Sequence, residues 1–372
     1  DMLIKNIDVY HLVCETSDAV TFAHLSIPYR AMLLCKVTTD EGIVGYGEID
    51  APSTGIPGTI ELLTQSFAPR LVGKDVENIG SLWDEMFATL EPMGRLRSHE
   101  VYVLGAIDTA LWDIMGKAVG RPVSQLLGQY RTRLKAYASL GYANRDKVAQ
   151  VVEESVERGF QSIKVRIGVV PGEEKGLLGL AREVAGEKIG LMADVNSGWA
   201  PHNAVRNARR LECFDLEWIE EPLRTYHLDE VARIAQAIDT PIALGEHQIF
   251  TRYDVRMVLE RKAADIIQPD MRAGGISEVK RIADIASAWE VPCIPHFYGN
   301  GIRFAAMVQL LGSISNYVYI ENDIHVSPLR DELVPDCPRA VGGYVDVPSK
   351  PGLGVTVDEA VLAKYTVAHQ RV

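Results

Sequence analysis

The chain has 372 residues, of which 47% are hydrophobic and 24% are charged, a composition typical of a globular protein with a large core and two domains. The formal net charge of −12 argues against broad binding to nucleic acid or to an anionic membrane surface. A run of about 18 apolar residues, which would indicate a transmembrane helix, is absent, and the first residues lack the apolar centre of a secretory signal.

Cysteine usage indicates the redox environment. The five cysteines are scattered and form no Cys-x-x-Cys pair, which is typical of a reducing compartment and argues against a disulfide framework or a thiolate metal site. We therefore expect a cytoplasmic location. The residues are Cys14, Cys35, Cys213, Cys293 and Cys337.

The first 50 residues have β character. Strands are predicted over 3–12, 31–38 and 43–48, and the turn Thr39-Asp40-Glu41-Gly42 joins the last two. A polar, irregular loop is expected over 14–30, and a loop rich in Pro, Gly and Ser over 50–58. Loops of this length in a compact domain are usually functional or mobile.

Helical periodicity follows, over 59–71, 79–90 and 101–119, and Gly120-Arg121-Pro122 ends the last helix. We therefore predict an α+β domain over residues 1–130.

From Leu134 onward, short apolar runs alternate with helical patterns, and this predicts parallel strands that close into a barrel over 131–321. The first two strands are expected at 134–140 and 162–167, and the eighth at 317–320, with no strong helix after it. Helices are expected at 146–158, 174–185, 202–211, 228–238, 253–260, 277–289 and 302–314. The tail, 322–372, should return to the first domain, with a short strand at 344–347 and a short helix at 357–364.

Six chemically active side chains follow the last six predicted strands at intervals of 24 to 26 residues: Asp194, Glu220, Glu246, Asp270, His296 and Glu321. Because the carboxyl ends of barrel strands meet at one face, where active sites form, these side chains should share one site. A single acid after a strand is usually a helix cap or a solvated loop residue. Six in register, with Lys164 one unit earlier, favour a functional set.

Three carboxylates from consecutive strands, Asp194, Glu220 and Glu246, can converge on one cation. Oxygen ligands favour Mg²⁺, with Mn²⁺ as a possible substitute. Unpaired carboxylates held together also resist ionisation, which favours a cation between them.

Asp270 and His296 have the arrangement of a general base, because a carboxylate orients an imidazole and raises its proton affinity. A buried structural pair is the alternative. Glu321 is predicted to hydrogen-bond at the substrate's edge; the alternative is a loop or salt-bridge acid.

Lys164 and Arg166 should both point into the barrel mouth, because side chains alternate along a strand. Two buried cations suit a bound carboxylate, although a purely structural pairing with Asp194 or Glu220 is the alternative. Arg166 is a poor base, whereas Lys164 could act as one if its neighbours lower its pKa. A divalent ion, a cationic pair and an imidazole suit removal of the proton α to a carboxylate.

These residues resemble the enolase superfamily, specifically its mandelate racemase group. The resemblance covers nearly the whole chain and rests on a series of short motifs in order. They are Lys164-Val165-Arg166, Asp194-Val195-Asn196, Trp218-Ile219-Glu220-Glu221-Pro222, Gly245-Glu246, Gln268-Pro269-Asp270, Gly274-Gly275, Pro295-His296, Glu321 and Pro351-Gly352-Leu353-Gly354-Val355, with 105–117 similar to the family's N-terminal helix.

The resemblance implies an α/β fold: a modified TIM barrel, (β/α)₇β, under an N-terminal α+β capping domain that the C-terminal tail completes. It implies one Mg²⁺ on Asp194, Glu220 and Glu246, the Asp270–His296 pair as base, and Glu321 on the substrate carboxylate. The loops over 14–30 and 50–58 would close over the substrate. Candidate substrate contacts are His24, Tyr29 and Asn196.

One departure affects the expected reaction. The racemase pattern has a second lysine where this chain has Arg166, so one face loses its usual base. We therefore favour a one-base reaction: dehydration of a small anionic sugar acid to a 2-keto-3-deoxy acid. The alternatives are a racemase, epimerase or cycloisomerase that uses the same enolate, and a non-catalytic barrel kept for binding. A homo-oligomer is also expected.

Overall fold

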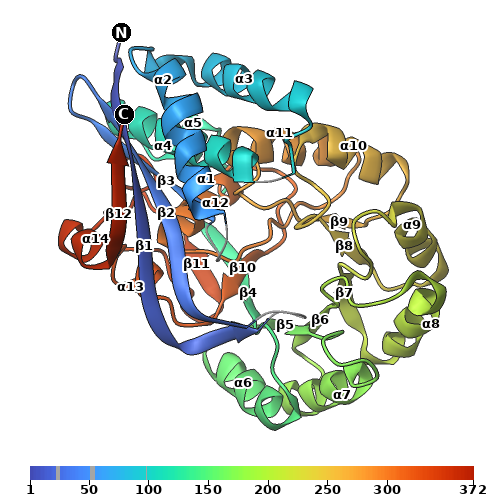
Figure 1. Ribbon diagram of the computed structural model, residues 1–372. Coiled ribbons are helices and arrows are strands. Elements are labelled where there is room, and N and C mark those ends of the chain that lie inside the picture. The colour runs from blue at the N-terminus through green and yellow to red at the C-terminus, as the bar shows by residue number, and fades with distance from the viewer. Residues whose placement is uncertain (22–25, 51–54, 98) are drawn as a thin grey trace.

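The computed structural model describes residues 1–21, 26–50, 55–97 and 99–372, and for 17–21, 26–28, 50 and 93 it describes the backbone alone. Two sheets organise these residues (Figure 1). One is a four-stranded antiparallel sheet, and the other is a curled sheet that is parallel from β4 to β10. The predicted α/β class, with a barrel and a separate α+β region, is confirmed.

The antiparallel sheet has the order β12-β1-β2-β3. Strands β1 (Ile4–Thr21) and β2 (Ser26–Thr39) form one long hairpin, and β3 (Val44–Asp50) returns beside β2. The expectation of an irregular loop over 14–30 is therefore wrong for most of its length, since the ladder continues through Glu15 opposite Tyr29. Backbone hydrogen bonds hold this segment as a strand although its side chains lack the apolar alternation from which strands are predicted.

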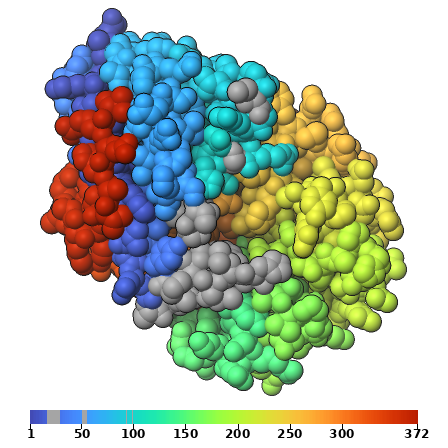
Figure 2. All heavy atoms as spheres, in the orientation of Figure 1, coloured from blue at the N-terminus to red at the C-terminus, as the bar shows by residue number. Residues whose placement is uncertain are grey.

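The chain ends in a strand that the sequence did not predict, β12 (Thr366–Arg371), which pairs with β1. Its side chains are largely exposed, so no hydrophobic pattern marks it. The buried carboxylate of Asp8 accepts hydrogen bonds from Arg371 Nε and is paired with His369 Nε2, each at 2.7 Å. The tail thus lies beside the N-terminal strands, as Figures 1 and 2 show in red and blue. The exact domain limits stay a prediction.

Helices cover one face of the antiparallel sheet, and α4 (His99–Ala118) packs on β3. Gly47 allows this close approach, because a Cβ there would lie 1.8 Å from the Ala106 carbonyl oxygen. The helix predicted over 59–71 is divided into α1, the π-helix η1 and α2. The remaining bounds are α1 (Ile56–Glu61), η1 (Leu62–Phe67), α2 (Ala68–Leu71), η2 (Val76–Asn78), α3 (Ile79–Leu90), η3 (Glu91–Met93) and α5 (Val123–Leu126).

The parallel strands run around the barrel in the order β10-β4-β5-β6-β7-β8-β9. The predicted seventh strand is present only as the parallel bridges Ile267–Cys293 and Asp270–His296. The strands are β4 (Arg133–Ser139), β5 (Ser162–Arg166), β6 (Gly190–Asp194), β7 (Leu216–Glu220), β8 (Ile242–Leu244), β9 (Ile266–Ile267) and β10 (Ile320–Asp323).

Helices surround the barrel within one or two residues of the predicted starts (Figure 1). No long helix follows β10; instead β11 pairs with β4, and α13 and α14 lead to β12. The bounds are α6 (Arg145–Glu157), α7 (Glu174–Ala185), α8 (Pro201–Leu211), η4 (Glu212–Phe214), α9 (Leu228–Ala237), α10 (Arg252–Glu260), α11 (Gly275–Ala288), α12 (Gly301–Leu311), α13 (Pro328–Asp331), β11 (Tyr344–Asp346) and α14 (Glu359–Tyr365).

An apolar layer fills the barrel interior. It consists of Tyr137, Met192, Trp218, Ala243, Ile266, Ile294 and Tyr319. Met192 and Trp218 stand two positions before Asp194 and Glu220. Because side chains two apart on a strand share a face, the polar residues form the next layer of the barrel, at the carboxyl ends of its strands. In the described part of the chain, no helix has the length and apolar character needed to cross a bilayer.

We expect Met192→Ala to lower the free energy of unfolding by about 2–5 kcal/mol, because it leaves a cavity in this layer, where Met192 is fully buried. Urea denaturation of the metal-free protein measures the loss. Val341→Ala, at a 74% exposed position, is the control and should change stability by less than about 0.5 kcal/mol. Equal effects of the two substitutions would contradict a packed interior.

Candidate active site

Three neighbouring strands place charged residues side by side at the barrel mouth. Arg166 on β5 is in register with Asp194 on β6, and Asp194 is in register with Glu220 on β7. All three side chains are buried. Their pairing therefore decides whether this layer is stable, since unpaired buried charges are costly.

Lys164 lies between two carboxylates. Its Nζ is 2.5 Å from Glu220 Oε1 and 2.7 Å from Glu321 Oε1. Burial alone would lower the pKa of Lys164, but Glu220, Glu321 and Asp194 raise it above its usual value. The lysine is thus held as a cation in this arrangement, and the lowered pKa that a lysine base requires is not found.

Glu220 accepts two further hydrogen bonds on its other oxygen, from Trp218 Nε1 at 3.0 Å and Gln268 Nε2 at 2.8 Å. Burial raises the pKa of Glu220 to about 7, against the effect of Lys164 and with the help of the neighbouring acids Asp194 and Glu321. A carboxylate in this position gains from any additional positive charge beside it.

Arg166 donates from Nε to Asp194 Oδ2 at 3.0 Å. Burial opposes the charge of Arg166, but Asp194, Glu246 and Glu220 raise the pKa of its guanidinium. Asp194 also accepts from the backbone N–H of Asn196 at 2.7 Å. The pairings of Lys164 with Glu220 and of Arg166 with Asp194, which the sequence allowed as an alternative, are therefore present.

The His296 ring has a different partner at each nitrogen. Nδ1 is 2.8 Å from Asp270 Oδ2, and Nε2 is 3.3 Å from Glu246 Oε2. Burial would lower the pKa of His296, but Glu246, Glu321 and Asp270 raise it. Asp270 is itself held by the backbone N–H of Arg272 at 2.9 Å. Asp270 and His296 thus lie within hydrogen-bond distance of each other, as predicted, and the backbone of Arg272 supports the carboxylate.

Glu246 lies between two histidines, with His247 Nε2 3.5 Å from Oε1 and His296 Nε2 3.3 Å from Oε2. Burial would raise the pKa of Glu246, but His296, His247, Arg272 and Arg166 lower it. Its buried Oε2 accepts no hydrogen bond from the described residues. This oxygen therefore has capacity for a further ligand.

Glu321 connects the two sides of the mouth. One oxygen contacts Lys164, and the other accepts the backbone N–H of Phe297 at 2.8 Å. Because Phe297 follows His296, Glu321 holds the segment that carries the imidazole. Its predicted contact with a substrate carboxylate stays a prediction.

The predicted substrate contacts are less defined. Asn196 is half-buried beside Asp194 with a positive φ of 50°. Tyr29 is half-buried on β2. His24 lies outside the described residues. The roles of all three remain predictions.

The site also contains three residues for which no role was predicted. They are Gln268, Arg272 and His247. Gln268 stands two positions before Asp270, so strand alternation could have indicated that it faces the interior. Arg272 Nε is 3.5 Å from Asp270 Oδ2, and its place in a loop gave no such signal. His247 directly follows Glu246, and only the fold shows that its ring turns back onto that acid.

The residues fit a divalent cation in their chemistry. The predicted set places five carboxylates against two permanent cations, Lys164 and Arg166, and oxygen donors suit Mg²⁺. Among the described residues, however, no three His, Cys, Asp or Glu side chains are grouped so that they could hold one ion. Asp194 is paired with Arg166, Glu220 with Lys164, and Glu246 lies against two histidines. The three ligands are thus brought to one mouth without converging, and their shared ion stays a prediction.

Comparison with known proteins identifies the family of the chain. A model of the enolase C-terminal domain-like family matches residues 147–361, and one of the mandelate racemase / muconate lactonizing enzyme N-terminal domain matches residues 7–128. The chain belongs to the enolase superfamily. The resemblance seen in its motifs is therefore confirmed for the mandelate racemase / muconate lactonizing enzyme family.

Several relatives within the enolase superfamily match over nearly their full length. The arabinonate dehydratase of Saccharolobus solfataricus is 33% identical, over 98% of this chain and 99% of the relative. The D-galactarolactone cycloisomerase of Agrobacterium fabrum is 31% identical, over 92% and 93%. The crystal structure of the 3,6-anhydro-D-galactonate cycloisomerase from Zobellia galactanivorans is 31% identical, with a TM-score of 0.88 over 98% of this chain and 100% of that chain.

A racemase structure from Streptomyces coelicolor, with bound magnesium, is 26% identical, with a TM-score of 0.89 over 98% of this chain and all of that chain. The superfamily thus includes hydro-lyases and isomerases, and a member with magnesium.

We expect Lys164→Met to lower the free energy of unfolding in EDTA by roughly 3–5 kcal/mol, because two buried carboxylates lose their cation. Denaturant titration measures this loss. The control is Lys350→Met, which removes the ion pair between Lys350 and Asp336, 3.0 Å apart at the surface. This substitution should lower the free energy of unfolding by at most about 1 kcal/mol. If Lys164→Met were as mild as its control, the buried pairing would not stabilise the barrel mouth.

Proposed function

We propose that the protein is a Mg²⁺-dependent hydro-lyase that removes the proton α to the carboxylate of a sugar acid and expels the β-hydroxyl, giving a 2-keto-3-deoxy acid. The observation that carries the proposal is the Asp270–His296 pair at 2.8 Å, beside Glu246 at the barrel mouth. Curated relatives named arabinonate, D-xylonate and L-talarate/galactarate dehydratase support the class of reaction.

Asp194, Glu220 and Glu246 would hold one Mg²⁺, and Mn²⁺ suits the same oxygen donors. Bound there, the ion would neutralise the substrate carboxylate and stabilise the enediolate. The Oε2 of Glu246, which accepts no hydrogen bond from the described residues, and the raised pKa of Glu220 both support a cation at this place.

His296 would be the base. Asp270 accepts from Nδ1, which leaves Nε2 of the neutral ring to take the α-proton, and the raised pKa makes the imidazole a stronger acceptor. The same nitrogen can then give its proton to the departing hydroxyl, so that one group serves both steps. The carbanion's electron pair forms the double bond of an enol, which becomes the keto acid.

Lys164 and Arg166 would bind negative charge rather than transfer protons. The pKa of Lys164 is raised by its carboxylates after burial has opposed the charge, and arginine is a poor base. Two competent bases, one on each face, are needed for racemisation. Their absence from the predicted set favours dehydration of a small anionic substrate.

An isomerase is the second candidate, because two cycloisomerases are among the similar proteins. Ring opening of a lactone uses the same enolate and needs one base only. Assembly as a homo-oligomer and a cytoplasmic location are further proposals from the sequence.

Dehydration should be visible in D₂O when a library of sugar acids is incubated with enzyme and Mg²⁺. We expect a keto acid that carries deuterium at the former β-carbon, as judged by NMR and a colorimetric keto-acid assay. Deuterium or inversion at the α-carbon, or ring opening without water loss, would support the isomerase instead.

The matched variant for this assay is His296→Asn, which keeps a polar side chain but removes the base. It should lower kcat by at least about 10³-fold, because general bases contribute about 10²- to 10⁴-fold. The affinity for Mg²⁺ should change little. Retained turnover would exclude His296 as the base.

Magnesium should stabilise the protein, because a ligand that binds only the folded state adds about 2.7 kcal/mol at 100 times its Kd. We expect Tm to rise with Mg²⁺ and to fall back with EDTA. Glu246→Gln should weaken this shift, whereas Glu260→Gln, at an exposed site paired with Arg256, should not. An unchanged Tm in wild type would favour a non-catalytic barrel.

A further inference from the structure

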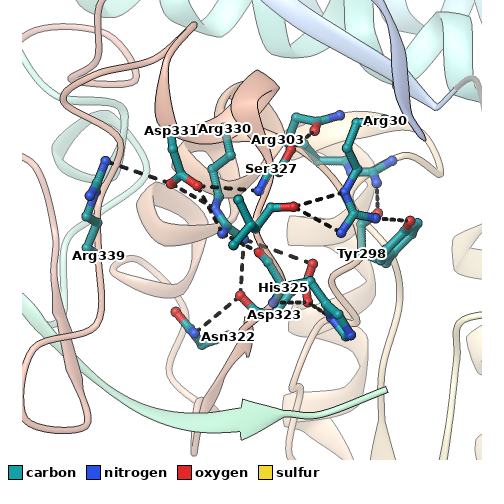
Figure 3. A network of polar contacts seen from close by, with 12 residues as sticks. Arg30, Tyr298, Arg303, Asn322, Asp323, His325, Ser327, Arg330, Asp331 and Arg339 are labelled. Atoms are coloured by element: carbon teal, nitrogen blue, oxygen red, sulfur yellow. Dashed lines mark hydrogen bonds and ion pairs between the residues drawn. The ribbon is translucent and has the colours of Figure 1, made fainter. Parts of the chain in front are cut away.

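The segment from Phe297 to Arg303 joins the proposed base, His296, to helix α12. The structure places two buried charged residues of the antiparallel sheet, Arg30 and Glu48, against this segment. Neither residue belongs to the predicted site. Figure 3 shows Arg30 with Tyr298, Arg303 and the loop that follows β10.

Glu48 supplies the cap of α12 from another part of the fold. Oε1 accepts the backbone N–H of Asn300 at 2.7 Å, and Oε2 accepts that of Arg303 at 3.0 Å. Asn300 is the N-cap residue of α12 but makes no side-chain cap hydrogen bond of its own. The first-turn amides, which need an acceptor, thus depend on a carboxylate from β3.

Arg30 hydrogen-bonds to the other end of the same segment. NH1 donates to Tyr298 Oη at 2.6 Å, and Nε and NH2 donate to the Val326 carbonyl at 3.3 and 3.2 Å. The guanidinium carbon also lies 5.5 Å from the Tyr298 ring centroid. One side chain of β2 therefore bonds the loop after His296 to the loop after Glu321 (Figure 3).

The two loops are also bonded to each other. Ser327 Oγ donates to Asn300 Oδ1 at 2.8 Å, and Glu321 accepts the N–H of Phe297. The segment that carries His296 is thus fixed by β10 from within the barrel and by Arg30 and Glu48 from the antiparallel sheet. Loss of one outer contact would leave the segment with half of its support from the antiparallel sheet, and loss of both would leave it held from the barrel side only.

The cost of these contacts argues that they serve more than packing. Arg30 is 5% exposed, and its hydrogen-bond acceptors among the described residues are a phenol and a carbonyl rather than a carboxylate. A buried charge compensated in this way is expensive. An apolar side chain could fill the space at lower cost but could not bond both loops.

We propose that Arg30 and Glu48 are positioning residues of the proposed dehydration: they hold the segment 297–303 so that the His296 ring stands at its working place. The inference rests on the proposed function for its effect on turnover and on the geometry alone for its effect on the segment. Misplacement of a catalytic group by about 1 Å can cost about 10²-fold in rate, so the effect should appear in kcat.

The test compares Arg30→Met, Arg30→Lys and Glu48→Gln with the wild-type holoenzyme. The control is Arg97→Met, which removes another arginine contact to the barrel, the pair with Asp254 near the start of α10. The measurements are kcat and KM for a sugar acid that the wild type dehydrates, Mg²⁺ affinity, Tm, and hydrogen–deuterium exchange of the amides over 297–303.

We expect kcat to fall about 10- to 100-fold in Arg30→Met and Glu48→Gln, with Mg²⁺ affinity within about 2-fold of wild type. Exchange over 297–303 should be faster, especially at Asn300 and Arg303 in Glu48→Gln. Arg30→Lys should recover part of kcat, because an ammonium can make one of the bonds but not all of them. Arg97→Met should leave kcat and this exchange unchanged.

Unchanged exchange in folded variants would overturn the proposal, and so would faster exchange with wild-type kcat, since the contacts would then be structural only. If Arg30→Met fails to fold, Arg30→Lys decides the same question. If wild type dehydrates no sugar acid, the proposed function fails, and the exchange measurement still decides whether Arg30 and Glu48 hold the segment.

Discussion

The buried ammonium of Lys164, shared between Glu220 and Glu321, is the interaction on which the barrel mouth depends. The layer beneath it is a buried hydrophobic cluster, and the three charged side chains are themselves at most 2% exposed, so their charges must neutralise one another. A cation that engaged Glu220 would compete with Lys164 for the same carboxylate. The lysine would then keep only Glu321 of its two carboxylate partners.

The antiparallel sheet and its helices do more than cover the barrel. Asp108 on α4 accepts from Ser277 N at 2.9 Å, in the first turn of α11, and Glu48 accepts the first amides of α12. These helices follow the two segments that carry Asp270 and His296. Asp108 is fully buried, and this burial raises the pKa of its carboxyl to about 7. The dyad is thus built on the barrel but supported from the neighbouring region.

The strongest sequence predictions were those in which one local pattern had one structural outcome. The ends of β6 and β7 fall at Asp194 and Glu220 as expected, and α3 and α7 have the predicted bounds. The repeat of 24 to 26 residues predicted which side chains lie at the same end of the barrel, because parallel strands of equal spacing end on one face. β10 begins at Ile320 rather than at 317, so Glu321 lies inside the last strand and not after it.

What the sequence did not predict depends on partners distant in the chain. β12 is polar and exposed, and it is a strand only because β1 lies beside it; the hairpin through Glu15 and Tyr29 has the same cause. Arg30 carries no local signal either, since Tyr298 and Val326 lie more than 260 residues away. Local periodicity records which face of an element is buried, whereas the support of a catalytic ring is a property of contacts between elements. Such supporting residues are therefore found by following the chain outward from the base and tracing the hydrogen bonds of its next residues, which in this fold leads from Tyr298 to Arg30 and from Asn300 to Glu48.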